Sequence, residues 1–374
     1  MEAQVKQPTT LEEQLELLSK RGMSLDKPLA LQWLSNVSYY RLSGYWYPYR
    51  VRAENGDQKN PVRLDDFVDG TSFCEVASLY EFDRKLRTLV YDGIERIEVA
   101  LRTRVGEWIT QHGALAYRES SLFREGFDHV AWLARVYSRV ARAKSSNAAI
   151  RHYENTYGHY PFWVVAEVLD FSDVSRLFSG LPVNVQHSIS ADFGFRVTVD
   201  KLSSKHKKSY NAQDPLARWC EQLTVVRNVC AHHARLFNRH FTPASTNAFR
   251  TIPALASLPC EQSDKLYGAL LIMAFMLRTI SPGTTWPMKL IDLIHKDFNN
   301  LNLRSTSEMG FPNNWEAGLV PPVPDLILHV ETALIAISLR DAHSLQDQLA
   351  VDTSAARRLP AGTTPSQAHG PGRR

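Results

Sequence analysis

The chain has few cysteines and no long apolar run. Its four cysteines form no Cys-x-x-Cys pair and have no zinc-ligand spacing with histidine, so we expect buried, reduced thiols, no metal site and no cofactor. The longest apolar run, Tyr267–Leu277, falls short of the ~20 residues that span a bilayer and predicts a buried helix. The N-terminus also lacks the apolar stretch of a signal peptide, so we expect a cytoplasmic protein without a membrane partner.

Nucleotide-binding motifs are missing as well. There is no GxxxxGKS or GxxxxGKT sequence and no GxGxxG after a strand, so nucleotide hydrolysis is not supported. The 43 basic and 39 acidic residues leave a net charge of only +4, so any strong positive field must be local. With 374 residues, 44% of them hydrophobic, the chain can form one large domain or two lobes around a sizeable core.

The most informative absence is local. From Gln222 to Cys260 there is no Asp or Glu, whereas four arginines are present: Arg227, Arg235, Arg239 and Arg250. A cationic surface without internal counter-charges suits a polyanion, and nucleic acid is the commonest one.

The spacing within residues 221–240 predicts a single helix. Residues three and four apart form a core-facing seam: Leu223, Val226, Cys230, His233 and Phe237. The opposite face carries Asn228, His232, Arg235 and Arg239. His233 is therefore expected in the core and His232 outside, beside Asn228. Arg227 lies about 140° around the helix from His232. Either its long side chain folds back, or the working pair comes from two copies, which predicts a homodimer.

These residue types suit metal-independent RNA cleavage. His232 would be the general base for a ribose 2′-hydroxyl or the general acid for the leaving 5′-oxygen, because both states of an imidazole are accessible near neutral pH. Arg227 would stabilise charge on the phosphate, and Asn228 would orient His232 or hold the phosphate. An ordinary amphipathic helix with a solvated basic face is an equal alternative on periodicity alone. A non-catalytic RNA-binding module and a structural dimer protein are further alternatives.

Other residues are candidates for RNA binding beside Arg235 and Arg239. Aromatic rings interleaved with arginines at residues 39–52, including Tyr40 and Arg41, suit unpaired bases, unless these rings pack the N-terminal lobe. The basic segment Ser203–Tyr210 is expected to be a solvated loop, although it would add phosphate contacts through Lys205, Lys207 and Lys208. The charges at Glu95, Arg96, Glu98 and Arg102 favour salt bridges over catalysis.

Helical periods dominate the rest of the chain and predict an all-α fold. Apolar residues that recur three and four positions apart from Leu79 to Val105 predict the longest helix. Further helices are expected after Thr10, from Lys27 towards Tyr40, over His129–Lys144 and over Pro161–Phe178, whereas the aromatic block reads as a turn or irregular segment around Gly44 and Pro48. No stretch alternates apolar and polar residues over enough positions to predict a sheet. The expected organisation is an N-terminal segment (1–75), a helical domain (76–342) and a disordered tail (343–374).

Four ordered blocks also resemble a known family. They are WLSNVSYYRLSGYWYPYR (33–50), LYEFDRKLRTLVYDGIERIEVALRT (79–103), YPFWVVAEVLDFSDVSRLF (160–178) and RNVCAHHARLFNR (227–239). Together they are similar to the Abi-like (AbiD/AbiF) abortive-infection proteins of the wider HEPN group, although Ser172 replaces the family's glycine. The resemblance implies a HEPN-like helical core and an RNase acting in phage defence or as a toxin. It also implies an RNA substrate and a small structured RNA antitoxin as partners.

Overall fold

The computed structural model describes residues 7–53 and 62–320. The prediction of an all-α fold is confirmed, because helices make up most of this part of the chain. The expected disordered tail at 343–374 lies outside the described residues. The boundary expected at residue 75 stays a prediction.

The α-helices are α1 (Leu11–Lys20), α2 (Lys27–Val37), α3 (Tyr39–Trp46), α4 (Phe73–Gln111), α5 (His129–Ala143), α6 (Ala148–Tyr157), α7 (Phe162–Ala166), α8 (Phe171–Gly180), α9 (Val183–Asp192), α10 (Ser204–Ala212), α11 (Pro215–Ala231), α12 (Leu266–Ile280), α13 (Trp286–Leu293) and α14 (Glu316–Leu319). Short 3-10 helices are η1 (Tyr47–Tyr49), η2 (Ala116–Arg118), η3 (Ser120–Leu122), η4 (Val199–Lys201), η5 (Phe249–Thr251), η6 (Pro253–Leu255) and η8 (Thr306–Met309), and η7 (Ile294–Phe298) is a π-helix.

Four short strands, which the sequence pattern did not predict, form two antiparallel pairs. They are β1 (Arg50–Arg52) with β2 (Arg63–Phe67), and β3 (Ala244–Ser245) with β4 (Gln262–Ser263). Strands of two to five residues are too short to show an alternating pattern in the sequence.

The predicted central helix is confirmed as α4, which is 39 residues long. The side chain of Ser72 caps it by accepting a hydrogen bond from the backbone N–H of Glu75 at 3.1 Å. Its apolar residues at threes and fours are all buried, from Leu79 through Ile97 to Val105. A single helix of this length can therefore support packing partners along about 58 Å.

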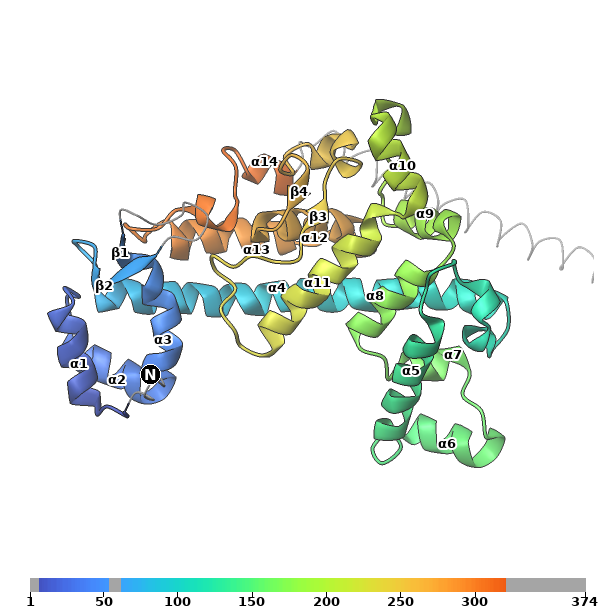
Figure 1. Cartoon of the computed structure of the whole chain (residues 1–374), viewed down its shortest axis with the longest axis horizontal. Coiled ribbons are helices and arrows are strands. Elements are labelled where there is room, and N and C mark those ends of the chain that lie inside the picture. The colour runs from blue at the N-terminus through green and yellow to red at the C-terminus, as the bar shows by residue number, and fades with distance from the viewer. Residues whose placement is uncertain (1–6, 54–61, 321–374) are drawn as a thin grey trace, which may run out of the picture. The chain divides into compact units, whose positions relative to one another are not determined.

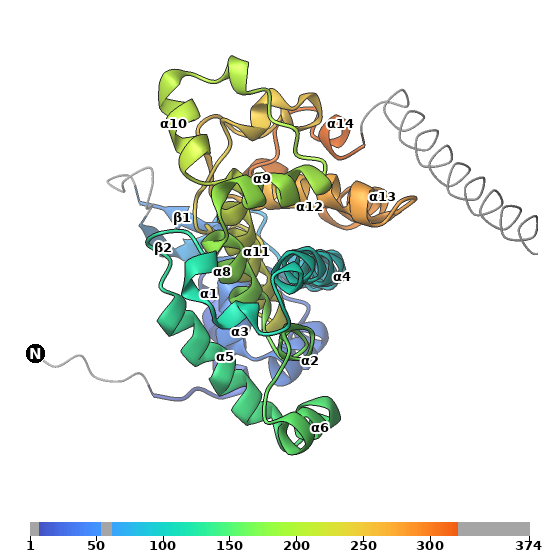
Figure 2. The same ribbon diagram turned by 90° about the vertical axis from the view of Figure 1, so that its right-hand side faces the viewer.

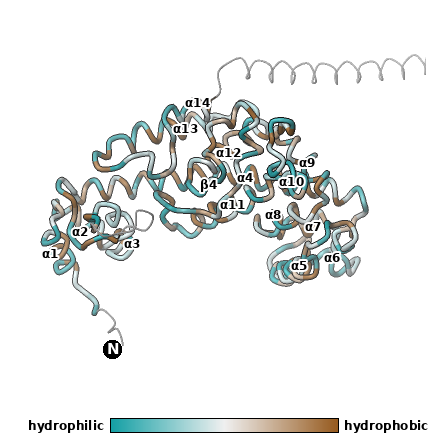
Figure 3. The backbone as a smooth tube through the Cα atoms, turned by 45° about the horizontal axis from the view of Figure 1, so that its top comes forward, coloured by the Kyte–Doolittle hydropathy of each residue, from teal (hydrophilic) through white to brown (hydrophobic). Residues whose placement is uncertain are grey.

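The other helices pack around α4. Figures 1 and 2 both place α12 and α13 on one side of α4, and α2, α3, α5 and α6 on the other. Close packing is possible at Gly93, where a Cβ atom would lie only 2.8 Å from Met273 and from Trp286. Hydrophobic and hydrophilic stretches alternate along the helices in Figure 3, as expected for helices with one buried face. The apolar run at residues 267–277 lies within α12 and is almost wholly buried, as predicted.

Two segments are helical where the sequence predicted an irregular segment or a loop. The aromatic block is not irregular: Ser38 caps α3 by accepting from the N–H of Arg41 at 3.5 Å, and η1 continues directly after it. The basic segment expected as a loop is the helix α10, capped by Ser203. In both segments a serine side chain caps the start of a helix, although the amino-acid composition of the segment does not predict one.

The helix expected over Pro161–Phe178 is two helices, α7 and α8. The break occurs because Asp170 and Asp173 form a capping box that starts α8. Ser172 lies in the first turn of α8, and its backbone is not in the left-handed region where a glycine would be needed.

The prediction that the cysteine thiols are buried is correct for two of the four. All four thiols are free, but Cys74 and Cys260 are exposed while Cys220 and Cys230 are buried. Over the described ranges, no helix combines the length and the apolarity needed to cross a membrane.

Candidate functional site

Helix α11 carries the predicted catalytic residues near its C-terminal end. Asp214 caps its start and Pro215 occupies the first helical position. The predicted seam is buried at Leu223, Val226 and Cys230, and it packs against α4 and α8. The helix ends at Ala231, however, so Arg235 and Arg239 lie in the following loop and not on the helix face predicted for them.

The two histidines both lie at this end. His232 is the C-cap residue; it is exposed, as predicted, and its backbone N–H donates to the carbonyl of Asn228 at 3.0 Å. The prediction of a buried His233 is wrong. This residue is exposed and has a φ of 55°, because the chain turns out of the helix through the left-handed region at the position where Schellman-type ends do so.

Arg227 and Asn228 are brought together beside a carboxylate from α4. The Nη1 atom of Arg227 lies 3.5 Å from Oδ1 of Asn228, and its Nε atom lies 3.9 Å from Oε2 of Glu98. The guanidinium also lies over the exposed ring of Tyr91, 5.8 Å from its centroid. The Arg227 side chain remains 27% exposed, so part of its fork can reach a ligand.

Glu98 is a site residue that the sequence did not reveal as such. The predicted ion pair with Arg102 is present, at 2.8 Å, but Glu98 also faces Arg227 from the next helix. Burial raises the pKa of the Glu98 carboxyl, and the charges of Arg102 and Arg227 oppose that rise. No spacing in the sequence connects residue 98 with residue 227, so only the packing of α11 on α4 could show this contact.

The loop after α11 is held by the buried carboxylate of Asp83. Asp83 accepts hydrogen bonds from the backbone N–H groups of Leu236 (3.2 Å) and Phe237 (2.6 Å) and from the hydroxyl of Tyr45 (2.7 Å). It also forms an ion pair with Arg87. Since Phe237 reaches the core through this loop, its predicted burial is correct although the helix ends six residues earlier.

Helix α3 also contacts this loop. Nη1 of Arg41 donates to the backbone carbonyl of His233 at 2.6 Å, and the neighbouring Tyr40 side chain is 89% exposed. The guanidinium of Arg235 donates to the carbonyl of Gly44. The structure therefore brings Arg41 to the end of α11, next to His233.

The remaining RNA-binding candidates differ in position. Arg235 is partly buried, and burial lowers its pKa. Arg239 is exposed and makes no hydrogen bond or ion pair with any residue that the structure describes. The three lysines of α10 precede the N-terminal end of α11, which is about 25 Å from its C-terminal end by the rise of a 17-residue helix. They do not join the catalytic candidates.

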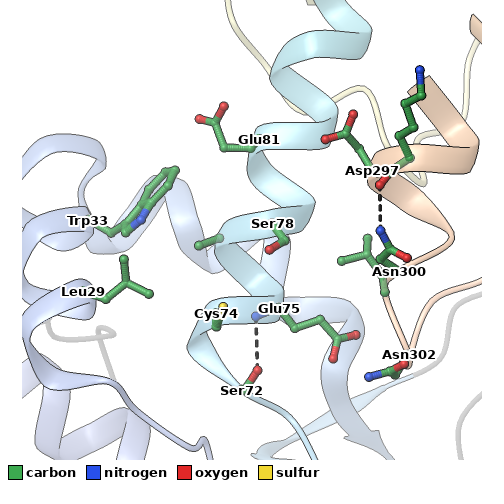
Figure 4. Close-up of a pocket in the computed structure, with 13 residues that line it drawn as sticks. Leu29, Trp33, Ser72, Cys74, Glu75, Ser78, Glu81, Asp297, Asn300 and Asn302 are labelled. Atoms are coloured by element: carbon green, nitrogen blue, oxygen red, sulfur yellow. Dashed lines mark hydrogen bonds between the residues drawn. The ribbon is translucent and has the colours of Figure 1, made fainter. Parts of the chain in front are cut away.

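A pocket of about 550 Å³ lies elsewhere, between α2, the start of α4 and the segment after α13 (Figure 4). None of the predicted site residues lines it. Its walls carry the carboxylates of Glu75, Glu81 and Asp297, which would repel a polyanion. Among the described residues, no group of three or more His, Cys, Asp and Glu side chains is arranged to hold a metal ion.

The fold and the site define an all-α protein with a half-buried Arg and an exposed Asn and His at the end of one helix, anchored by contacts from α3 and α4. The family model described as "Abi-like protein" matches residues 32–238, which is more than half of the chain, and the chain belongs to this family. Its membership suggests a role in abortive infection. None of the curated proteins or solved structures that were compared matches the chain.

Proposed function

We propose that this protein is a metal-independent endoribonuclease of the HEPN type that acts as an abortive-infection or toxin effector in phage defence. The observation that supports it best is the exposed His232 at the end of α11, with Arg227 and Asn228 on the preceding turn. Membership of the Abi-like family is compatible with a nuclease and suggests the defence role. The segment 222–260, free of Asp and Glu, favours an anionic substrate.

The proposed reaction is transphosphorylation within RNA. His232 removes the proton from a ribose 2′-hydroxyl as general base, or protonates the leaving 5′-oxygen as general acid. The 2′-oxygen bonds to phosphorus while the bond from phosphorus to the 5′-oxygen breaks, which leaves a 2′,3′-cyclic phosphate and a 5′-hydroxyl. DNA lacks the nucleophile and is not cut.

Arg227 and Asn228 would stabilise the transition state. The guanidinium of Arg227 binds the non-bridging oxygens, where negative charge grows as phosphorus becomes pentacoordinate. Glu98 on one side and Asn228 on the other limit the positions that this guanidinium can adopt. Pre-positioned charge costs little reorganisation during the reaction and is therefore effective.

Two partners belong to the proposal. Arg227 lies five positions before His232, on a different side of the helix, so a homodimer could complete each site with Arg227 from one copy and His232 from the other. A small structured RNA antitoxin would restrain the enzyme, since an uncontrolled RNase harms its host.

The test is cleavage of RNA by the purified protein in EDTA, with end-group analysis. We expect 2′,3′-cyclic phosphate ends, and a loss of about 10³-fold or more in rate for His232→Ala and Arg227→Ala, with RNA affinity retained by the His232 variant. The matched control is His233→Asn, because His233 is an exposed histidine one residue away and asparagine tolerates its left-handed backbone. This control should remain active.

Three results would contradict the proposal. Strict dependence on magnesium would exclude the metal-independent mechanism. Activity lost in His233→Asn but kept in His232→Ala would show that the wrong ring was assigned. RNA binding without cleavage by the wild type would favour the alternative, a non-catalytic RNA-binding regulatory module of the same family.

A further inference from the structure

A second basic segment lies outside the site described so far. Residues 129–153 contain no Asp or Glu, and they include α5 and the first part of α6. Five cations lie in this segment: Arg135, Arg139, Arg142, Lys144 and Arg151. Like the segment around α11, it lacks carboxylates of its own, and such a surface attracts a polyanion.

Three of these arginines form a row on α5. Arg135, Arg139 and Arg142 are spaced four and three residues apart, so they share one face of the helix. The buried face of α5 is a different one and carries His129, Trp132, Val136 and Val140. The row therefore borders the core and faces outwards.

The middle arginine fixes the row against α8. Arg139 forms ion pairs with Asp170 and with Asp173 at the start of this helix, the second at 2.9 Å. Arg135 and Arg142 are exposed, and neither makes a hydrogen bond or ion pair with a residue in the described ranges. Two cations without counter-charges thus flank one that is neutralised.

The start of α8 also contacts the site. The carbonyl of Leu169 accepts a hydrogen bond at 3.2 Å from Arg102, which is the ion-pair partner of Glu98. Burial raises the pKa of Glu98, and the nearby charge of Asp170 adds to that rise. Figure 1 shows α5 and the C-terminal end of α11 on the same side of α4. Residues 169 and 170 therefore lie between the α5 row and Arg227.

We propose that Arg135 and Arg142 bind phosphates of the RNA strand beyond the cleaved bond. The strand would cross the start of α8 and continue along α5. The two arginines are seven residues apart, about 10 Å along the helix axis, so they can contact separate phosphates of one strand. This inference rests on the proposed function and names the surface that holds the rest of the substrate.

The experiment measures RNA binding by the full chain in a His232→Ala background, which prevents turnover. The probes are an unstructured RNA of about 20 nucleotides and one of about 4, near the lower end of single-strand site sizes. For Arg135→Gln/Arg142→Gln we expect about tenfold weaker binding of the long RNA. The slope of log affinity against log salt should fall by about 1.4, roughly 0.7 for each lost phosphate contact. Binding of the short RNA should not change.

The matched control is Arg196→Gln/Lys289→Gln, which removes two exposed cations from the α9–α10 connection and from α13. Figures 1 and 2 place α9 and α13 on the side of α4 opposite α5, so this control should bind the long RNA like the parent. Circular dichroism and the melting temperature show that each variant folds.

The possible failures can be distinguished. If the parent binds RNA and the wild type cleaves it, but the α5 variant keeps the full affinity and salt slope, the α5 inference is wrong and the proposed function stands. An equal loss with the control variant also overturns the inference, because the effect is then one of net charge. If the wild type neither binds nor cleaves RNA, the proposed function fails, and the α5 surface with it.

Discussion

The guanidinium of Arg41 donates a hydrogen bond to the backbone carbonyl of His233, which lies 192 residues further along the chain, at 2.6 Å. In the opposite direction, Arg235 donates to the carbonyl of Gly44. These two bonds join α3 to the loop that follows α11. The conformation of His232, immediately before this loop, therefore depends on a distant segment.

Replacing Arg41 with alanine should lower cleavage by about 10- to 100-fold through the position of His232. Since Arg41 is exposed, the free energy of unfolding should fall by only about 1 to 2 kcal/mol. Steady-state kinetics with a defined RNA distinguish two roles, because a positioning role lowers kcat whereas a simple phosphate contact raises KM. Unchanged kinetics would show that the loop does not need this bond, and Arg41→Lys should restore part of the activity.

The buried carboxylate of Asp83 should be more important for stability than for chemistry. Asp83→Ala leaves the Arg87 charge unpaired in the interior and two backbone N–H groups without an acceptor, so we expect a loss of about 3 to 5 kcal/mol. Tyr45→Phe removes the hydrogen bond that the hydroxyl donates to the same carboxylate and the one that it accepts from Arg87, but it leaves the ion pair intact and should cost only about 1 to 2 kcal/mol. Urea unfolding followed by circular dichroism measures both. Equal losses for the two variants would contradict the central role of Asp83.

Helices with a periodic apolar pattern over many residues, or with a local capping motif, could be predicted from the sequence. The apolar threes and fours of α4 and the capping box at Thr10 both correspond to observed helices. Gly44 and Pro48 usually mark turns and therefore favour an irregular segment, whereas the Ser38 cap and the burial of Tyr45 and Trp46 stabilise α3. Tertiary packing outweighs weak local preferences in such short segments.

The candidate site could be predicted only in part. The exposure of His232 and its position one turn after Asn228 follow from the helical period. The end of α11 could not be found in this way, because the apolar spacing continues through His233 to Phe237 while the backbone turns away. Asp83 holds that loop and Glu98 faces Arg227 through contacts between distant segments. A helical period contains no information about such contacts.

Protonation of Glu98 should cause part of the fall in cleavage activity at acidic pH. Burial raises its pKa above the usual value for glutamate, so the carboxylate becomes neutral at a less acidic pH than an exposed one would. As the pH falls through this raised pKa, Glu98 no longer attracts Arg227, and kcat/KM should fall. Glu98→Gln should be about tenfold less active at neutral pH and should lack this part of the profile.

The control for this pH profile is Glu95→Gln. Glu95 is an exposed carboxylate on the same helix, three residues from Glu98, and its loss should leave the profile as in the wild type. An acid limb that persists unchanged in Glu98→Gln would show that Glu98 does not act through Arg227.

The proposed division of each site between two copies predicts complementation. Arg227→Ala and His232→Ala are each expected to be inactive alone. If Arg227 of one copy works with His232 of the other, a mixed dimer of the two variants contains one intact site and one doubly defective site. Random exchange at equal concentrations makes half of the dimers mixed, so the activity should return to about one quarter of the wild-type value. Cleavage after mixing and subunit exchange measures this recovery, with each variant alone and their unmixed sum as controls. If mixed dimers form, as mass spectrometry can show, but no activity returns, both residues must act within one chain, and the long side chain of Arg227 must reach the phosphate beside its own His232.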